Sequence, residues 1–298
     1  MEILITGSSG LIGTALVEAL TGQGHRPVGL VRRPASGADE IRWSPADDEI
    51  DAASLEGFDG VVHLAGAGIG DKRWNDEYRR VLVESRTGPT ALLAKTLAAL
   101  DRPPSVLLSG SAIGFYGDRG DELLTEESGA GRGFLPDLVT AWEAAAQPAA
   151  AAGIRTAFLR TGIVLTNKGG ALGKLLPLFK FGLGGKMGSG RQYWSWITLA
   201  DEVGAIMHLL RVEVAGPVNL TAPEPVTNAA FTEALGDVLG RPTFVPVPSF
   251  GPKVLLGAEM AQSLLFDSQR ILPDVLTLSG YRFAQPDISS GLRAAVDD

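Results

Sequence analysis

The chain has 298 residues, a formal net charge of −8 and no cysteine. Its 45% hydrophobic and 20% charged residues are typical of a globular protein with a buried core. The acidic charge argues against a nucleic-acid partner, and the absence of cysteine excludes disulfides and thiolate chemistry. Three widely separated histidines, His25, His63 and His208, argue against a metal site. No apolar run has the length of a secretory leader or a membrane span, so we expect a cytoplasmic protein with no membrane partner.

Residues 3–13, I-L-I-T-G-S-S-G-L-I-G, predict a buried strand over 3–6 and a helix over about 11–23. Three glycines separate the two elements. Gly7 allows a sharp turn, Gly10 allows backbone N–H groups to approach a diphosphate, and Gly13 allows close packing of the helix. A diphosphate would lie at the helix N-terminus, where unpaired N–H groups favour an anion. The alternative is a glycine-rich turn without a ligand. The predicted cofactor residues of this segment are Thr6, Gly7, Ser9, Gly10, Leu11, Ile12 and Gly13.

Further strands alternate with helices along the first half of the chain. The pattern predicts strands at 27–31, 60–64, 105–109 and 155–159, and helices at 76–100 and 138–152. Strands that are apolar on both faces indicate a doubly wound parallel sheet of the Rossmann type, an α/β fold that binds its ligand at the carboxyl ends of the strands.

A change of composition after Gly162 predicts a second, smaller domain. Residues 167–190 are rich in glycine, and the chain beyond Gly216 carries many prolines and short helical patterns. We therefore expect an NADP-binding Rossmann domain over 1–164 together with 192–220. The smaller, discontinuous C-terminal domain, formed by 165–191 and 221–298, would bind the substrate.

The residues that follow the second strand indicate which dinucleotide binds. Arg32 and Arg33 stand where an acidic residue would bind the ribose hydroxyls of NAD, and no acidic residue follows before Asp39. A guanidinium group suits a phosphate, so we expect NADP(H). The alternative is that both arginines belong to a solvated turn. Leu64, Ala65 and Gly66 end a later strand, where small residues would let the backbone approach the adenosine ribose. His63, in the same strand, is interpreted as structural.

Taken together, these motifs resemble the extended short-chain dehydrogenase/reductases, which include nucleotide-sugar epimerases and dehydratases. The resemblance covers essentially the whole chain. It rests on T-G-x-x-G-x-x-G at 6–13, H-L-A-G at 63–66, S-G-S-A-I-G-F-Y-G at 109–117, L-R-T-G-I-V-L at 159–165 and W-S-W-I-T-L-A-D at 194–201.

Three further segments resemble an atypical "epimerase family" subgroup of uncharacterised NADP-binding proteins. They are G-L-G-G-K-M-G-S-G at 182–190, N-L-T-A-P-E-P-V-T-N at 219–228 and S-Q-R-I-L-P at 268–273. The resemblance implies a fold and a cofactor more directly than a reaction.

The resemblance also implies roles for individual residues. Ser109 and Ser111 match strand-end residues beside the nicotinamide that hold a substrate oxygen, and Tyr116 matches a tyrosine near the substrate. The segment 159–165 matches the one whose backbone meets the nicotinamide carboxamide. It contains Thr161 and the predicted cofactor residues Arg160, Gly162 and Val164. The alternative for each of these positions is packing alone.

The family's catalytic pair, Tyr-x-x-x-Lys, is absent. No tyrosine in the chain is followed four residues later by lysine, and the helix where the pair belongs reads L-V-T-A-W-E over 138–143. Candidates for the missing proton donor are Ser111, Tyr116 and Glu143. Glu143 would serve as an acid if burial beside Trp142 raised its pKa. The alternative is that Glu143 caps or pairs on a helix surface.

The substrate side is predicted from residues 182–196. As a strand, 191–196 would direct Gln192, Trp194 and Trp196 to one face. Aromatic rings in a pocket would stack on a planar or sugar-like ligand, while a cation would bind an anion. The alternative for both tryptophans is the core. Ser109, Lys186, Arg191 and Trp194 are the predicted substrate-binding residues.

Two functions from different classes remain. The first is an NADP(H)-dependent oxidoreductase or epimerase-like enzyme that acts on a small polar, sugar- or nucleotide-like substrate without the Tyr/Lys pair. The second is a sensor or regulatory protein that binds NADPH and has little catalytic activity. The resemblance also implies a homodimer through the helices at 76–100 and 138–152.

Overall fold

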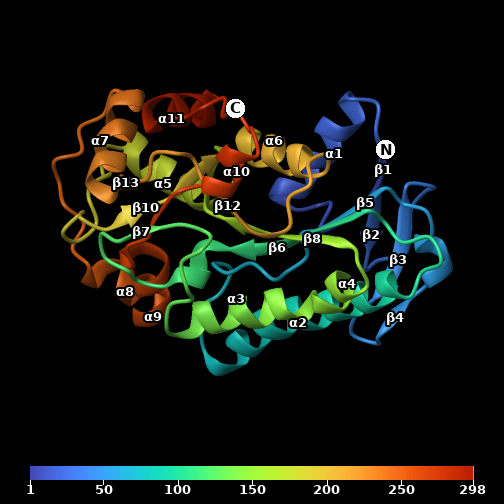
Figure 1. Cartoon of the computed structure of the whole chain (residues 1–298). Coiled ribbons are helices and arrows are strands. Elements are labelled where there is room, and N and C mark those ends of the chain that lie inside the picture. Colours follow the sequence, from blue (N-terminus) through green and yellow to red (C-terminus); the bar gives the residue numbers. More distant parts are fainter. Residues whose placement is uncertain (298) are drawn as a thin grey trace.

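The computed structural model describes residues 1–297 and contains one large, almost entirely parallel sheet (Figure 1). Its strand order is β12-β8-β6-β5-β1-β2-β3-β4, and every neighbouring pair is parallel except β3 with β4. The chain reverses direction across the sheet between β1 and β5, so the predicted doubly wound fold is confirmed. The strands are β1 (Glu2–Thr6), β2 (Arg26–Val31), β3 (Glu40–Ser44), β4 (Glu49–Ile50), β5 (Gly60–His63), β6 (Val106–Ala112), β8 (Arg155–Thr161) and β12 (Gly216–Leu220).

Helices cover both faces of this sheet. Ile3 and Ile5 of β1 pack in one apolar cluster with α1 (Leu11–Gly22) and α6 (Leu199–Leu209). Leu4, which points to the opposite face, packs in a second cluster with α2 (Asp76–Ala98) and α4 (Gln147–Ala151). Helix α3 (Phe134–Ala145) lies against α2 on that second face. This burial on both sides explains why the central strands carry apolar residues on both faces.

The helix predicted at 138–152 is two helices. It begins earlier, at Phe134, and α3 gives way to α4 at Ala146, just before Pro148. Proline has no N–H to continue the helical ladder, so it suits the first turn of a new helix. Strands β3, β4 and β12, which the sequence pattern does not predict, extend the sheet at its two ends.

A third apolar cluster lies beyond the sheet. It contains residues from β9 (Ile163–Leu165), α5 (Gly170–Lys180), α7 (Asn228–Leu239) and α11 (Ile288–Asp297). A core of its own is what a smaller domain requires. The proposed domain boundaries remain a prediction. The sequence assigns residues 192–220 to the sheet domain, but Trp194 and Trp196 pack in this third cluster, whereas Ile197 packs in the cluster on the sheet.

The segment 191–196 is not one continuous strand. Tyr193–Trp194 forms β10, which pairs with β13 (Val226–Thr227), and Trp196–Thr198 forms β11, which pairs with β9. Gln192, Trp194 and Trp196 are all buried, and so is Ser195, so burial does not distinguish the two faces that the sequence predicts. The remaining elements are β7 (Leu123–Leu124), β14 (Arg270–Ile271), α8 (Phe250–Leu256), α9 (Ala258–Ala261), α10 (Asp274–Leu278), a π-helical turn (Gln262–Phe266) and 3-10 turns at Ala52–Leu55 and Ile113–Tyr116.

Among residues 1–297, no helix is both long enough and apolar enough to span a membrane.

Candidate functional site

Two positions of the glycine turn, Gly7 and Gly13, have no room for a side chain. Gly7 has φ 69°, and a Cβ there would lie 2.8 Å from the carbonyl oxygen of Leu64. A Cβ on Gly13 would lie 2.1 Å from the Gly7 oxygen, which no rearrangement of a side chain can relieve. Helix α1 starts at Leu11, and its N-cap residue Gly10 has no side chain to cap it. Its first N–H groups are therefore available to an anion, as a dinucleotide diphosphate requires.

Thr6 holds the ends of β1 and β5 together behind this turn. Its Oγ1 accepts hydrogen bonds from the N–H groups of Leu64 (3.1 Å) and Ala65 (3.2 Å) and lies 2.7 Å from His63 Nδ1. His63 is fully buried, its Nε2 is 2.9 Å from Thr90 Oγ1, and burial lowers its pKa to about 4. These contacts support the structural interpretation of His63 and give Thr6 a positioning role.

Arg86 is a residue of this region that the sequence analysis missed. It reaches from α2 to donate a hydrogen bond to the carbonyl oxygen of Ala67 at 2.9 Å, and its guanidinium lies over the Trp142 ring at 5.1 Å. A Cβ on Gly66 would lie 3.3 Å from Arg86 Cζ. The arginine therefore fixes the loop after β5, where the cofactor's adenosine ribose is expected. An arginine inside a long helix carries no sequence signal for that role.

The two arginines after β2 differ in their surroundings. Arg33 binds Glu40 with both terminal nitrogens, and its side chain is 56% exposed. Arg32 is also exposed, and no residue of the described chain 1–297 pairs with it. Of the two arginines predicted to bind a phosphate, Arg32 is therefore free within that part of the chain, and Arg33 is paired with Glu40.

Ser111, Glu143 and Arg160 form a buried polar group at the carboxyl ends of two neighbouring strands. Ser111 on β6 donates a hydrogen bond from Oγ to Glu143 Oε1 at 2.6 Å. Arg160, which is the register partner of Ser111 on β8, binds the same carboxylate with Nε at 2.8 Å and Nη2 at 2.9 Å. Arg160 thus contacts both oxygens of the Glu143 carboxyl group, and this pairing does not support the expected role of Glu143 as an acid free to face a substrate. Glu143 forms an ion pair, as the alternative interpretation predicts. The pair does not lie on an open helix surface, however, because only 13% of the Glu143 side chain is exposed.

Tyr116 belongs to the same network but is fully buried. Its hydroxyl donates to Asn219 Oδ1 at 2.7 Å and accepts from Arg160 Nη1 at 3.0 Å, while burial raises its pKa. A buried phenol with both bonds satisfied cannot touch a substrate without a rearrangement, so the structure gives Tyr116 a positioning role. Asn219, the first residue of the 219–228 motif, is the partner that sequence reasoning did not single out.

The other residues predicted beside the nicotinamide surround this network. Ser109 is fully buried and its hydroxyl has no partner within the described chain. Thr161 donates to Glu202 Oε1 at 2.8 Å. A Cβ on Gly162 would lie 2.8 Å from the Ser195 oxygen, so that position is restricted by the backbone beside it. Arg160, predicted as a cofactor contact, is 4% exposed and is committed to Glu143 and Tyr116.

The structure separates the predicted substrate residues. Trp194 is 5% exposed, packs on Phe231 with ring centroids 5.1 Å apart, and donates a hydrogen bond from its indole to Leu265. These contacts favour the alternative interpretation, in which Trp194 belongs to the core. Lys186 and Arg191 are exposed, on the loop that leads into β10. Their assignment to a substrate remains a proposal.

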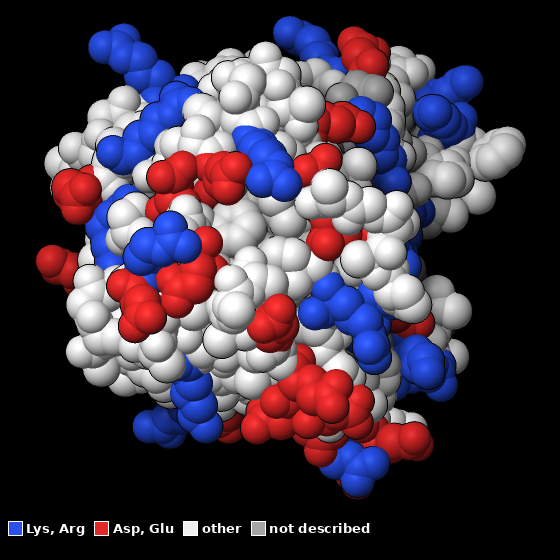
Figure 2. Space-filling model, turned by 90° about the vertical axis from the view of Figure 1, so that its right-hand side faces the viewer, with Lys and Arg blue, Asp and Glu red and all other residues white. Residues whose placement is uncertain are grey.

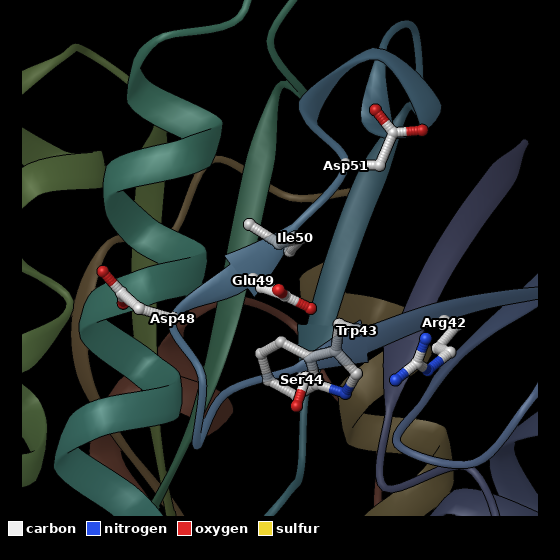
Figure 3. A pocket seen from close by; sticks show the side chains of 7 residues that line it. All are labelled: Arg42, Trp43, Ser44, Asp48, Glu49, Ile50 and Asp51. Atoms are coloured by element: carbon white, nitrogen blue, oxygen red, sulfur yellow. The ribbon is translucent and has the colours of Figure 1, made fainter.

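A shallow hollow of about 420 Å³ lies at the other end of the sheet, along β3 and β4 (Figure 3). It is lined by Arg42, Trp43, Ser44, Asp48, Glu49, Ile50 and Asp51. It contains none of the predicted catalytic residues, and its aromatic residue, Trp43, is only 3% exposed. The polar network at β6 and β8, rather than this hollow, is the candidate catalytic site.

Comparison with known proteins agrees with this geometry. A family model described as the NAD dependent epimerase/dehydratase family matches residues 3–221, and one described as a domain of unknown function (DUF1731) matches 247–295. Fold and site define a dinucleotide-binding protein of the short-chain dehydrogenase/reductase type. The chain belongs to the NAD dependent epimerase/dehydratase family, which confirms the resemblance seen in the sequence.

Relatives match over the whole chain. The human epimerase family protein SDR39U1 is 35% identical over 300 residues, which cover 99% of this chain and 100% of that protein. The epimerase family protein Mb2239 of Mycobacterium bovis is 41% identical over 291 residues, covering 97% and 96%. A crystal structure of human SDR39U1 (isoform 2) with NADPH superposes with a TM-score of 0.92 at 34% identity, covering 100% of both chains.

Proposed function

We propose that this chain is an NADP(H)-dependent oxidoreductase or epimerase-like enzyme for a small polar substrate of the sugar or nucleotide class. The observation that carries the proposal is the Ser111–Glu143–Arg160 group, which stands at the carboxyl ends of β6 and β8, the edge at which doubly wound sheets bind ligands. The NADPH bound by the human relative supports the choice of cofactor, as do the two arginines after β2.

The residues present fit a dinucleotide. Gly7 and Gly13 let the turn, the Leu64 carbonyl and the start of α1 pack closer than a Cβ would allow, and the uncapped start of α1 presents N–H groups to a diphosphate. The nicotinamide would supply or accept a hydride when bound. Ser9, Leu11 and Ile12 would then contribute backbone contacts, and Leu64, Ala65 and Gly66 would lie along the ribose.

The Ser111–Glu143 pair can move the proton that accompanies the hydride. During oxidation of a substrate hydroxyl, Ser111 would take its proton and pass its own to the Glu143 carboxylate 2.6 Å away. In the reverse direction, reduction of a substrate carbonyl leaves a negative charge on its oxygen. The Ser111 hydroxyl would donate a proton to that oxygen. Arg160 keeps Glu143 oriented, and Tyr116 and Asn219 keep Arg160 in place.

The second candidate is an NADPH sensor with little turnover. It is favoured by the complete burial of Tyr116, which leaves the family's other hydroxyl donor without access to a substrate. We also propose a homodimer through the exposed sides of α2 and α3 and keep the cytoplasm as the expected location.

Fluorescence titration with NADPH and with NADH in one buffer is the first test. A preference for NADPH of about tenfold, or roughly 1.4 kcal/mol, supports the cofactor assignment, and equal binding contradicts it. A panel of sugar-like carbonyl compounds then separates the two functions. Consumption of NADPH that is lost in Ser111→Ala supports the enzyme, whereas tight binding without consumption across the panel supports the sensor.

A further inference from the structure

On the basis of the proposed use of NADP(H), we propose that Glu40 occupies the binding site for the adenosine 2′-phosphate in the ligand-free protein. There it acts as an internal competitor that limits the preference for NADPH over NADH. Glu40 would thus be a specificity-determining residue that lies outside the glycine motif and outside the two arginines.

Glu40 lies on the face of the sheet that carries the glycine turn. In the parallel pair β2–β3, Gly29 is the register partner of Glu40, and Val31 is the partner of Arg42. Side chains of register partners point to the same face of a sheet. A Cβ on Gly29 would lie 2.9 Å from Ser8 Oγ in the glycine turn. Glu40 and Arg42 therefore face the side on which the adenosine half of a dinucleotide would lie.

The groups that hold the Glu40 carboxylate form a set suited to a phosphate. Arg33 donates from Nη1 at 2.6 Å and also from Nη2, Ser36 N donates at 2.8 Å, and Ser36 Oγ at 2.7 Å. A guanidinium fork, a main-chain N–H and a hydroxyl are the donors that recur around phosphate groups. These donors hold the pKa of Glu40 down to about 2, so the carboxylate is charged at neutral pH.

Two more cations stand beside this set without a partner. Neither Arg32 nor Arg42 forms an ion pair or hydrogen bond through its side chain within residues 1–297. Figure 2, which looks onto this end of the molecule, shows Lys and Arg side chains interspersed with Asp and Glu. The free arginines can attract a second anion while Glu40 still holds Arg33.

The Glu40–Arg33 pair is exchangeable because it lies at the surface. The Arg33 side chain is 56% exposed and the Glu40 side chain 20%, and exposed ion pairs contribute little net stability. A 2′-phosphate must displace Glu40 from Arg33 and Ser36, or bind close to the negative charge of Glu40. The free 2′-hydroxyl of NADH carries no charge and does not need these donors. Glu40 therefore weakens the binding of NADPH and leaves the binding of NADH almost unaffected.

The test compares Glu40→Gln, Arg33→Ala and the double variant with the unmodified chain. Dissociation constants for NADPH and NADH are measured by titration, and adenosine 2′-phosphate and adenosine 5′-phosphate serve as probes of the phosphate site alone. We expect Glu40→Gln to tighten NADPH and adenosine 2′-phosphate by about three- to tenfold and to change NADH by less than about twofold. The gain should disappear in the double variant, because it depends on Arg33. Circular dichroism confirms that each variant is folded.

Glu49→Gln is the matched control. It removes the same charge from the neighbouring strand β4, and we expect it to change NADPH binding by less than about twofold. Weaker NADPH binding in Glu40→Gln would show that Glu40 only positions Arg33, and equal gains for NADPH and NADH, or for Glu49→Gln, would show a general charge effect. Each of these results overturns the proposal.

If the unmodified chain binds neither dinucleotide but Glu40→Gln still gains affinity for adenosine 2′-phosphate through Arg33, the proposed cofactor is wrong and the phosphate site stands. If no variant binds any of the four ligands, both are wrong.

Discussion

The Glu143 carboxylate is held by hydrogen bonds from two neighbouring strands, from Ser111 on β6 and from Arg160 on β8. No such pair of contacts is visible along the chain, because the three residues are separated by 32 and 17 positions. Their convergence follows from the parallel sheet, in which strands distant in sequence end at one edge. We propose that Glu143 takes part in the proton transfer for which the family uses the Tyr/Lys pair, and a substitution of Glu143 tests this role.

Glu143→Gln should lower any turnover by well over about tenfold, because an amide cannot take the proton that Ser111 passes on. NADPH affinity should change little, which separates loss of proton transfer from loss of folding. Asp137→Asn, on the exposed side of the same helix, is the control and should retain activity. An unchanged rate in Glu143→Gln would remove Glu143 from the mechanism.

Glu202 should make stability depend on pH. It is fully buried, and burial raises its pKa to about 8 from the ordinary value of 4.5. Below pH 4.5 both the folded and the unfolded chain hold the proton. Between pH 4.5 and about 8 only the unfolded chain ionises, so the contribution of this group to the free energy of unfolding falls as pH rises.

Glu202→Gln cannot ionise, so its melting temperature should fall less than that of the unmodified chain between pH 5 and pH 8. Differential scanning calorimetry at several pH values measures the difference. Glu18→Gln, an exposed position on α1, should follow the unmodified chain. Parallel curves for the unmodified chain and Glu202→Gln would mean that Glu202 has an ordinary pKa in the folded state.

At the scale of elements, the short helices α8 and α9 are held to the sheet domain by few contacts. Helix α8 has no buried residue. Arg73 donates from Nε to the Leu255 carbonyl oxygen at 2.8 Å, and Arg79 on α2 pairs with Glu259 on α9. Elements with few apolar contacts open most easily, so these two arginines should control the mobility of residues 250–261.

The double variant Arg73→Ala/Arg79→Ala should speed amide hydrogen exchange in residues 250–261 and leave exchange in β1, β5 and β6 unchanged. Mass spectrometry of exchanged peptides measures both. Arg80→Ala is the control, since among residues 1–297 Arg80 pairs only with Glu84, within its own helix. Equal exchange in all three proteins would show that the arginines do not hold these helices.

At the scale of the whole molecule, the exposed sides of α2 and α3 are the surface proposed for dimerisation. Val81 on α2 is 37% exposed, and Ala144 on α3 is also exposed. We expect sedimentation velocity to show twice the chain mass of 31.2 kDa. Val81→Asp/Ala144→Asp should restore the single chain, because a buried unpaired charge destabilises an interface. A single chain in the unmodified protein would contradict the proposed dimer.

The glycine turn, the doubly wound sheet, the family and the absence of the Tyr/Lys pair can be recognised in the amino-acid sequence alone. These features depend on spacing and periodicity over a few neighbouring residues, which a chain displays directly. The tertiary structure decided the partners of Glu143, the burial of Tyr116 and Trp194, and the contact between Glu40 and Arg33. Those properties depend on which strands lie side by side and on what covers each side chain. Neighbours in space, rather than neighbours in sequence, set the charge and access of a polar group.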